Sequence, residues 1–364
     1  MTSPATGHRT TCGQCGGNMA WDAAASGLRC GSCGHVEPVG VPSSELAEHD
    51  LSDALRSPKA HWNLGGLARE VKCNECGASV EFPDGIAATR CAFCDSPSVL
   101  AREARSDLIA PESLIPFGVS RDQAAAAFRS WLGGLWLRPS DLRSKASISE
   151  LRGVYVPYWT FDASVMSRWS ADAGYYYYES ETYTVVQNGK GVTRTRSVRK
   201  VRWEPASGTR HDQYDDHLAC ASVGLPGDMA RFMANFDTRR LVPYTPQVLQ
   251  GFTAETYAVD LRDAWSRARE ELASSQLARC AGDVPGDTQR NLRATHQFLG
   301  MTYKHVLLPV WVAAFRYRGE VYRFLVNGQT GLVAGKAPWS PIKIVLATVL
   351  ALALCLILAH FATR

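Results

Sequence analysis

The sequence predicts an α+β fold with two small cysteine-rich modules at the N-terminus, a β-rich domain in the middle and one apolar helix at the end. Three observations support this prediction. Eight of the eleven cysteines fall in two frames of identical spacing. From residue 108 to residue 338, aromatic and β-branched segments typical of strands surround two amphipathic helical patterns. Residues 344–359 then carry no charged side chain.

Each cysteine frame consists of two Cys-x2-Cys pairs separated by fourteen residues, and the second frame lies 61 positions after the first. A tetrahedral zinc ion takes four ligands, and two such pairs joined by a hairpin supply them as thiolates. The sequence therefore predicts two zinc ribbons and two structural zinc ions, with Gly16, Gly34 and Gly77 at positive φ after three of the pairs. The predicted ligands are Cys12, Cys15, Cys30 and Cys33 in the first ribbon and Cys73, Cys76, Cys91 and Cys94 in the second.

Disulfide bonds are the alternative interpretation of these cysteines. They need an oxidising compartment and do not explain the repeated spacing. Residues 1–16 also lack the apolar run of a signal peptide. We therefore expect reduced thiolates and an N-terminal part that lies in the cytoplasm.

The apolar C-terminal stretch predicts a transmembrane helix over residues 342–361. Such a helix approaches the ~20 residues needed to cross a bilayer. Trp339 and Arg364 flank it as interfacial residues, and Lys343 can extend its charge outward. A buried core helix is the alternative. Together with the reduced cysteines, the stretch predicts a tail anchor in the cytoplasmic membrane, with the bulk of the chain in the cytoplasm.

The predicted domains are zinc ribbon 1 (1–40), a linker (41–67), zinc ribbon 2 (68–104), an α+β domain with antiparallel sheets (105–338) and the transmembrane helix (342–361). Within the α+β domain, a capping box at Ser120 and Gln123 predicts a helix that loosens at Gly133-Gly134. A second helix is predicted from about Asp260 to Gly282. After it, the predicted strands cover 306–316, 320–327 and 332–335.

The sequence pattern of the domain suggests two similar halves, each with a helix followed by a β-meander. Leu114–Phe117 precedes the first helix and Leu241–Tyr244 the second, and a Pro-x-Trp segment follows each helix, at 157–159 and 309–311. An internal duplication and a chance recurrence of proline and aromatic residues both account for this pattern.

One predicted strand carries a row of positive charge. With Asn188-Gly189-Lys190-Gly191 as the turn, Gln187 pairs with Val192 and Glu179 lies opposite Lys200. The basic row is a candidate contact for anionic lipid or phosphate, and an ordinary solvated strand face is the alternative. Its members, which alternate along the strand, are Arg194, Arg196, Lys200 and Arg202.

Charge and motifs disfavour several functions. The formal net charge is +4, from 39 basic and 35 acidic residues, and neither ribbon has the basic surface that nucleic-acid binding needs. Gly331 and Gly335-Lys336 are separated by three residues where a P-loop has four, so an ATP-driven motor is not supported. Residues 211–217 hold two histidines and three aspartates, which we interpret as a polar loop between strands. We expect no enzymatic activity, no catalytic residues and no small-molecule substrate.

Several segments resemble those of bacterial membrane-anchored proteins with zinc ribbons of the transcription-factor-IIB type. They are the two cysteine frames, Ile115–Phe117, Gly153–Asp162, Leu307–Trp311, Phe324–Gly331 and the apolar tail. Such proteins are often labelled as relatives of primosomal protein N′, a superfamily II helicase, whose ATPase motif this sequence lacks. The resemblance implies partners among SPFH (flotillin-like) proteins and phage-shock-protein-A-like (PspA-like) coat proteins, with the eight cysteines as zinc ligands.

The sequence thus predicts a non-enzymatic, membrane-anchored zinc-ribbon adaptor that docks SPFH-like or PspA-like proteins at the inner face of the membrane. The alternative is a membrane-tethered regulator that binds nucleic acid.

Overall fold

The computed structural model describes residues 11–40, 46–56, 69–82, 90–94, 96–103, 108–142, 147–148, 151–187, 190–225, 227–318 and 320–362. It confirms a mixed α/β protein, and the strands of these residues form two sheets. The first sheet belongs to ribbon 1 and contains β1 (Met19–Asp22), β2 (Gly27–Cys30) and β3 (Val36–Pro38).

All other strands of the described residues belong to one large sheet. They are β4 (His49–Asp50), β5 (Arg69–Cys73), β6 (Ser79–Phe82), β7 (Val99–Glu103), β8 (Ser113–Leu114), β9 (Ser147–Ile148), β10 (Arg152–Gln187), β11 (Lys190–Cys220), β12 (Val242–Pro243), β13 (Thr253–Glu255), β14 (Thr288–Tyr317), β15 (Glu320–Asn327) and β16 (Val333–Gly335).

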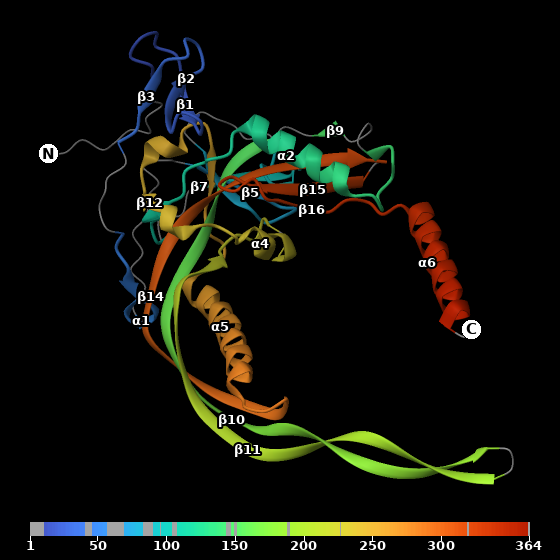
Figure 1. Ribbon diagram of the computed structural model, residues 1–364. Helices are drawn as coiled ribbons and strands as arrows, with labels where there is room; N and C mark the ends of the chain where they lie inside the picture. Colours follow the sequence, from blue (N-terminus) through green and yellow to red (C-terminus); the bar gives the residue numbers. More distant parts are fainter. Residues whose placement is uncertain are drawn as a thin grey trace.

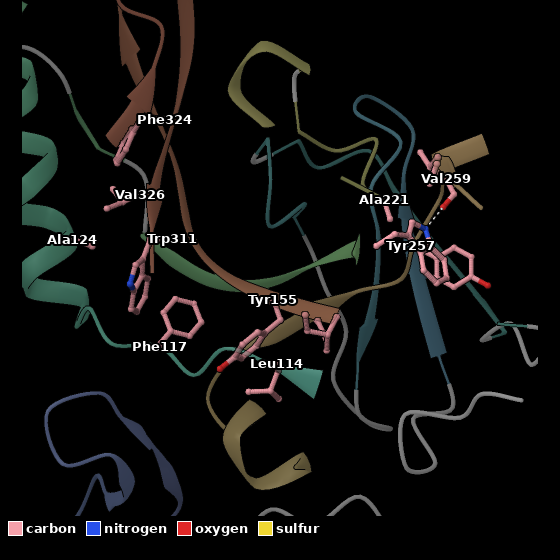
Figure 2. Packing of buried hydrophobic residues seen from close by; sticks show 14 of the residues in the cluster. Leu114, Phe117, Ala124, Tyr155, Ala221, Tyr257, Val259, Trp311, Phe324 and Val326 are labelled. Atoms are coloured by element: carbon pink, nitrogen blue, oxygen red, sulfur yellow. Dashed lines mark hydrogen bonds between the residues drawn. The ribbon is translucent and has the colours of Figure 1, made fainter. Parts of the chain in front are cut away.

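Two long antiparallel strands, β10 and β14, form the centre of the large sheet. They pair from Arg152 opposite Val312 to Gly174 opposite Thr288. Because side chains alternate along a strand, each strand contributes to two cores. Tyr155 and Trp311 belong to the core on one face, and Val156 and Val310 to the core on the other. In Figure 2, Phe117 lies between Trp311 and Tyr155 in the first core, and edge-on ring contacts join all three.

Two helices bury their apolar sides in the first core, and the structure confirms both predictions. The first, α2 (Arg121–Gly134), begins with the predicted capping box: Gln123 N–H donates to Ser120 Oγ, and Ser120 N–H donates to Gln123 Oε1. The second, α5 (Leu261–Asp283), has Asp260 as its N-cap. A third helix, α4 (Gly227–Met233), packs into the second core, and α1 (Leu51–Arg56) lies beside β14.

Ribbon 2 is built into the large sheet. Its strand β6 pairs with β13, with Glu255 opposite Val80, and β13 runs parallel to β10. The predicted boundary at residue 104 therefore separates two segments that share one sheet. Ribbon 1 keeps its own sheet but is docked through Trp21, whose backbone N–H donates to Gln250 O and whose indole N–H donates to Phe117 O.

Beyond Gly174, β10 and β11 leave the rest of the sheet and continue as a two-stranded ribbon. We call residues 175–202 the arm. Figure 1 shows the arm projecting well away from the molecule and twisting along its length. In the described residues it is supported near its base by Asp287, whose carboxylate accepts the N–H of Tyr176.

The apolar helix α6 (Pro341–Ala362) ends the described chain. Pro341–Phe361 is the one helix in the described residues that is long and apolar enough to cross a membrane, and none of its apolar window is buried. Figure 1 shows it standing apart from the other elements. Its length of about 33 Å, at 1.5 Å per residue, matches the hydrocarbon thickness of a bilayer.

Candidate metal centres

The structure brings each predicted set of four cysteines together. In centre 1, Cys12 Sγ lies 3.6 Å from Cys33 Sγ, and Cys15 Sγ lies 3.4 Å from Cys30 Sγ. In centre 2, the distances from Cys73 to Cys94 and from Cys76 to Cys91 are both 3.6 Å. Within each centre all four sulfur atoms lie within 4.8 Å of one another.

These distances fit a tetrahedral thiolate site. Four Zn–S bonds of ~2.3 Å at tetrahedral angles place sulfur atoms about 3.8 Å apart. Disulfide sulfurs would be separated by only ~2.05 Å. The two clusters can therefore each bind one metal ion through four sulfurs, in agreement with the predicted ligand sets.

Backbone amides surround the sulfurs as the sequence predicted. The N–H groups of Gln14, Gly17 and Ser32 donate to Cys12, Cys15 and Cys30, each over 3.4 Å. Gly16, Gly34 and Gly77 all have positive φ, between 71° and 78°. At these positions glycine lets the chain turn back, so that its N–H bonds to the carbonyl of Cys12, Cys30 and Cys73, respectively.

The clustered thiols shift one another's pKa values in opposite directions. Hydrogen bonds from the backbone N–H groups of Cys33 and Ser32 lower the pKa of Cys30 to about 6. Hydrogen bonding to Cys91 and Cys94, together with burial, instead raises the pKa of Cys76 far above its usual value. Four thiolates so close together repel one another, and a divalent cation at their centre removes this repulsion.

The polar surroundings of centre 2 were not predicted. Glu255, on β13, is 1% exposed, and Ser222 Oγ donates to its Oε1 over 2.8 Å. Burial raises the pKa of Glu255 to about 8. Gly224 is required beside it, because a Cβ there would lie 2.6 Å from Ala78 Cβ in ribbon 2. Ribbon 2 is therefore closely packed beside a buried carboxyl whose pKa is raised by that burial.

The interpretation of residues 211–217 as a loop is wrong, because these residues lie within β11. Their side chains make separate contacts along the strand: Asp212 pairs with Arg210 and Arg279, and His217 with Glu271. The sequence pattern was misleading because polar residues are tolerated on a long strand whose faces are only partly covered.

One acidic group forms at a β-bulge, where two residues of β11 lie opposite one residue of β10. Asp162, Asp215 and Asp216 place carboxylate oxygens within 4.8 Å of one another. Lys304 already supplies a cation there, since its Nζ lies 2.8 Å from Asp216 Oδ1 and 3.0 Å from Glu48 Oε1. This buried lysine was not predicted, and its sequence surroundings give no sign of its partners.

The structure places Arg194, Arg196, Lys200 and Arg202 on one face of the arm, but the predicted register is wrong by two residues. Gln187 pairs with Lys190, and Lys200 lies opposite Tyr177. Two residues of the sequence, and not the predicted four, therefore separate the paired residues Gln187 and Lys190. Since the shift is even, the same side chains stay on the same face.

Most of the charge in this basic row has local partners. Lys200 and Arg196 form ion pairs with Glu179 and Glu181, and Arg202 pairs with Glu204. Tyrosines add cation–π contacts, with Arg196 over Tyr183 and Arg202 over Tyr175. Whether this face contacts lipid or phosphate stays a prediction.

Comparison with known proteins gives one distant similarity. The chain is 27% identical to the uncharacterized protein YdjG of Bacillus subtilis (strain 168) over 343 residues, which cover 92% of this chain and 91% of that protein. No family model matches the chain, and no solved structure matches it.

Proposed function

We propose that this chain is a non-enzymatic, membrane-anchored adaptor that docks a cytoplasmic protein through the arm. Two structural zinc ions hold its ribbons, and α6 anchors it in the cytoplasmic membrane. The reduced state that metal-binding cysteines require supports a cytoplasmic location for the bulk of the chain.

The arm is the observation that carries this proposal. An isolated two-stranded ribbon is only marginally stable in water, yet this one extends for thirteen residue pairs past Gly174, from Tyr175 opposite Arg202 to Gln187 opposite Lys190. Tyr176, Tyr177, Tyr178 and Tyr183 are all at least 36% exposed on it. Tyrosine is enriched in protein interfaces, and unpaired strand edges accept an added strand. These features support docking of a protein.

The charge of the arm indicates the chemistry of the partner. Residues 175–202 contain six basic and two acidic side chains. Both glutamates are held in ion pairs with Arg196 and Lys200, so the excess charge on the arm is positive. An acidic surface on the partner would complement it. The resemblance of the sequence to zinc-ribbon membrane proteins points to an SPFH-like or PspA-like protein as that partner.

We also propose that the β-rich domain arose by duplication. Apart from the two-residue strand β9, which follows α2, the order β8, α2, β10, β11 recurs as β13, α5, β14, β15. The spacing is also alike: the N-cap Ser120 lies six residues after Leu114 of β8, and the N-cap Asp260 lies six residues after Ala254 of β13. Each short strand runs parallel to the long strand of the other unit. By this comparison β13 is the counterpart of β8. The sequence pattern had instead matched the segment at Leu114 with Leu241–Tyr244.

The adaptor proposal is tested by shortening the arm. Deleting residues 178–199 and joining Tyr177 to Lys200 through Asn-Gly keeps a two-residue turn between two residues that already pair. It also keeps the contact between Tyr176 and Asp287. Proteins that co-purify with the full-length chain in mild detergent are then identified. We expect an SPFH-like or PspA-like protein with the intact chain and its loss with the shortened arm.

The control carries Leu277→Ser and Leu299→Ser, which change exposed apolar residues outside the arm; it should retain the partner. Failure to recover an SPFH-like or PspA-like protein with the intact chain would count against the adaptor. Salt-sensitive retention of DNA or RNA that requires the arm would favour the nucleic-acid regulator. Arm-dependent binding to anionic vesicles without a protein partner would favour the lipid contact of Arg194, Arg196, Lys200 and Arg202.

A further inference from the structure

The first residues of α6 are fixed to the folded domain. Ser340 caps the helix, because its Oγ accepts the N–H of Lys343, and its own N–H donates to the carbonyl of Leu137 over 3.0 Å. Leu137 belongs to a turn, residues 135–142, that follows the end of α2. We call it the 135–142 turn. The chain thus enters α6 directly from a residue that is held on the domain.

Two further contacts join this turn to the segment before α6. Arg138 Nη1 donates to the carbonyl of Ala337 over 2.5 Å. The guanidinium of Arg138 also stacks on Trp339, with Cζ at 3.6 Å from the ring centroid. The turn and residues 337–340 therefore form one surface at the base of the helix.

Two tryptophans are exposed on this surface. Trp136 is 68% and Trp339 60% exposed, although tryptophan is usually well buried in folded proteins. Trp136 precedes Leu137, the residue hydrogen-bonded to Ser340. Arg138 and Lys343 add positive charge near the start of the helix, and so does exposed Lys336. Tryptophan with neighbouring basic residues is typical of the boundary between headgroups and hydrocarbon.

We propose that the 135–142 turn is a second, interfacial membrane contact, in which Trp136 inserts among the phospholipid headgroups beside Trp339. This inference rests on the proposed membrane insertion of α6. The headgroup layer of one leaflet is roughly 5–7 Å thick, from the difference between the hydrocarbon core and the whole bilayer. A backbone group bonded to Ser340, at the start of the apolar helix, must lie within or next to that layer. A phospholipid surface, and not a second protein, is therefore the partner of Trp136.

The experiment uses the full-length chain in vesicles of phosphatidylcholine and phosphatidylglycerol. A photo-crosslinking residue is introduced in three separate variants, Trp136→p-benzoylphenylalanine, Leu277→p-benzoylphenylalanine and Leu352→p-benzoylphenylalanine. Leu352 lies on α6 and Leu277 on α5, and all three side chains are exposed. Bound metal and circular dichroism show that each variant is folded. After illumination, lipid adducts are measured by mass spectrometry.

We expect lipid adducts at positions 136 and 352 and background at 277. Adducts at 352 but not at 136 would overturn the interfacial contact while leaving the anchor in place. Equal adducts at 136 and 277 would overturn it too, because they would show unspecific contact of the domain with lipid. The absence of an adduct at 352 would show that α6 is not in the bilayer. Both the proposed anchor and the proposed interfacial contact would then be wrong. None of these results depends on a protein partner.

Discussion

At the scale of single residues, Glu255 on β13, the strand that pairs with ribbon 2, makes the stability of the protein depend on pH. Glu255 is a buried carboxyl whose pKa is raised to about 8, chiefly by burial. An unfolded chain would return that carboxyl to about 4.5, so the folded protein binds the extra proton between these two values. A group of this kind stabilises the fold at low pH and loses that contribution as the pH rises.

Glu255→Gln should therefore flatten the pH dependence of stability. The amide keeps the shape of the neutral carboxyl and can accept the hydrogen bond from Ser222. We expect the free energy of unfolding of the unmodified protein to fall, relative to the variant, as the pH rises from 4.5 to about 8. Urea unfolding at several pH values measures this difference. A constant difference across the window would contradict a raised pKa at Glu255.

Sequence predicted the cysteine ligands at this scale and missed Glu255 and Lys304. The cysteines are recognisable because their spacing is local and repeats. Glu255 and Lys304 look like ordinary surface residues in the sequence, because their partners are distant in the chain. Glu255 bonds to Ser222, and Lys304 pairs with Glu48. Burial of this kind is decided by the packing of the sheet, which no short sequence pattern encodes.

Among the elements, the turn after β15 explains why Phe324–Gly331 is a distinctive segment. Asn327 is fully buried, and its Nδ2 donates to the carbonyls of Met233 and Asn235. Its Oδ1 accepts the N–H groups of Gln329 and Thr330. The segment thus joins the second meander to the end of α4 and its following loop. Its role in the structure is to hold these elements together.

Asn327→Ala should destabilise the domain without removing metal. The substitution leaves buried carbonyl and N–H groups unsatisfied, each at a cost of about 1–3 kcal/mol. We expect a loss of roughly 3 kcal/mol in the free energy of unfolding, measured by urea denaturation, with the metal content per folded chain unchanged. Gln297→Ala, at an exposed position on β14, is the control and should change stability little. Equal stability of both variants would show that the turn does not hold α4.

Local signals predicted the elements better than their extents. Ser120 and Asp260 start helices as expected, because capping depends on residues within one turn. The predicted register of the arm was wrong by two residues because Asn188 to Gly191 all favour turns, so the sequence does not decide whether two or four residues separate the strands. The interpretation of residues 211–217 as a loop was wrong because β11 continues through them.

At the scale of the whole molecule, the two metal centres occupy different positions. Centre 1 belongs to a separate small sheet that is docked through Trp21. Centre 2 belongs to a ribbon whose strand β6 extends the large sheet. Loss of the metal should therefore have different consequences at the two sites, although their ligands and spacing are the same.

Cys12→Ser and Cys73→Ser test this difference. Each should lower the bound zinc from about two ions per chain to about one. Since zinc in small modules contributes on the order of 10 kcal/mol to folding, Cys73→Ser should lower the melting temperature of the large sheet clearly, and Cys12→Ser only slightly. Metal analysis and thermal unfolding give the two readouts, with Cys355→Ser, on α6, as the control. Equal effects on melting would contradict the integration of ribbon 2.

The continuity of β10 has a mechanical consequence. One strand runs without a break from the centre of the sheet, at Arg152, to the end of the arm, at Gln187. A force that pulls the arm outward along this strand acts on its hydrogen bonds with β14 in shear, so that many bonds share the load. The same sheet continues through β14, β15 and β16 toward α6. Tension between the arm and α6 is thus borne by the long ladder between β10 and β14, without a flexible joint between β10 and the arm.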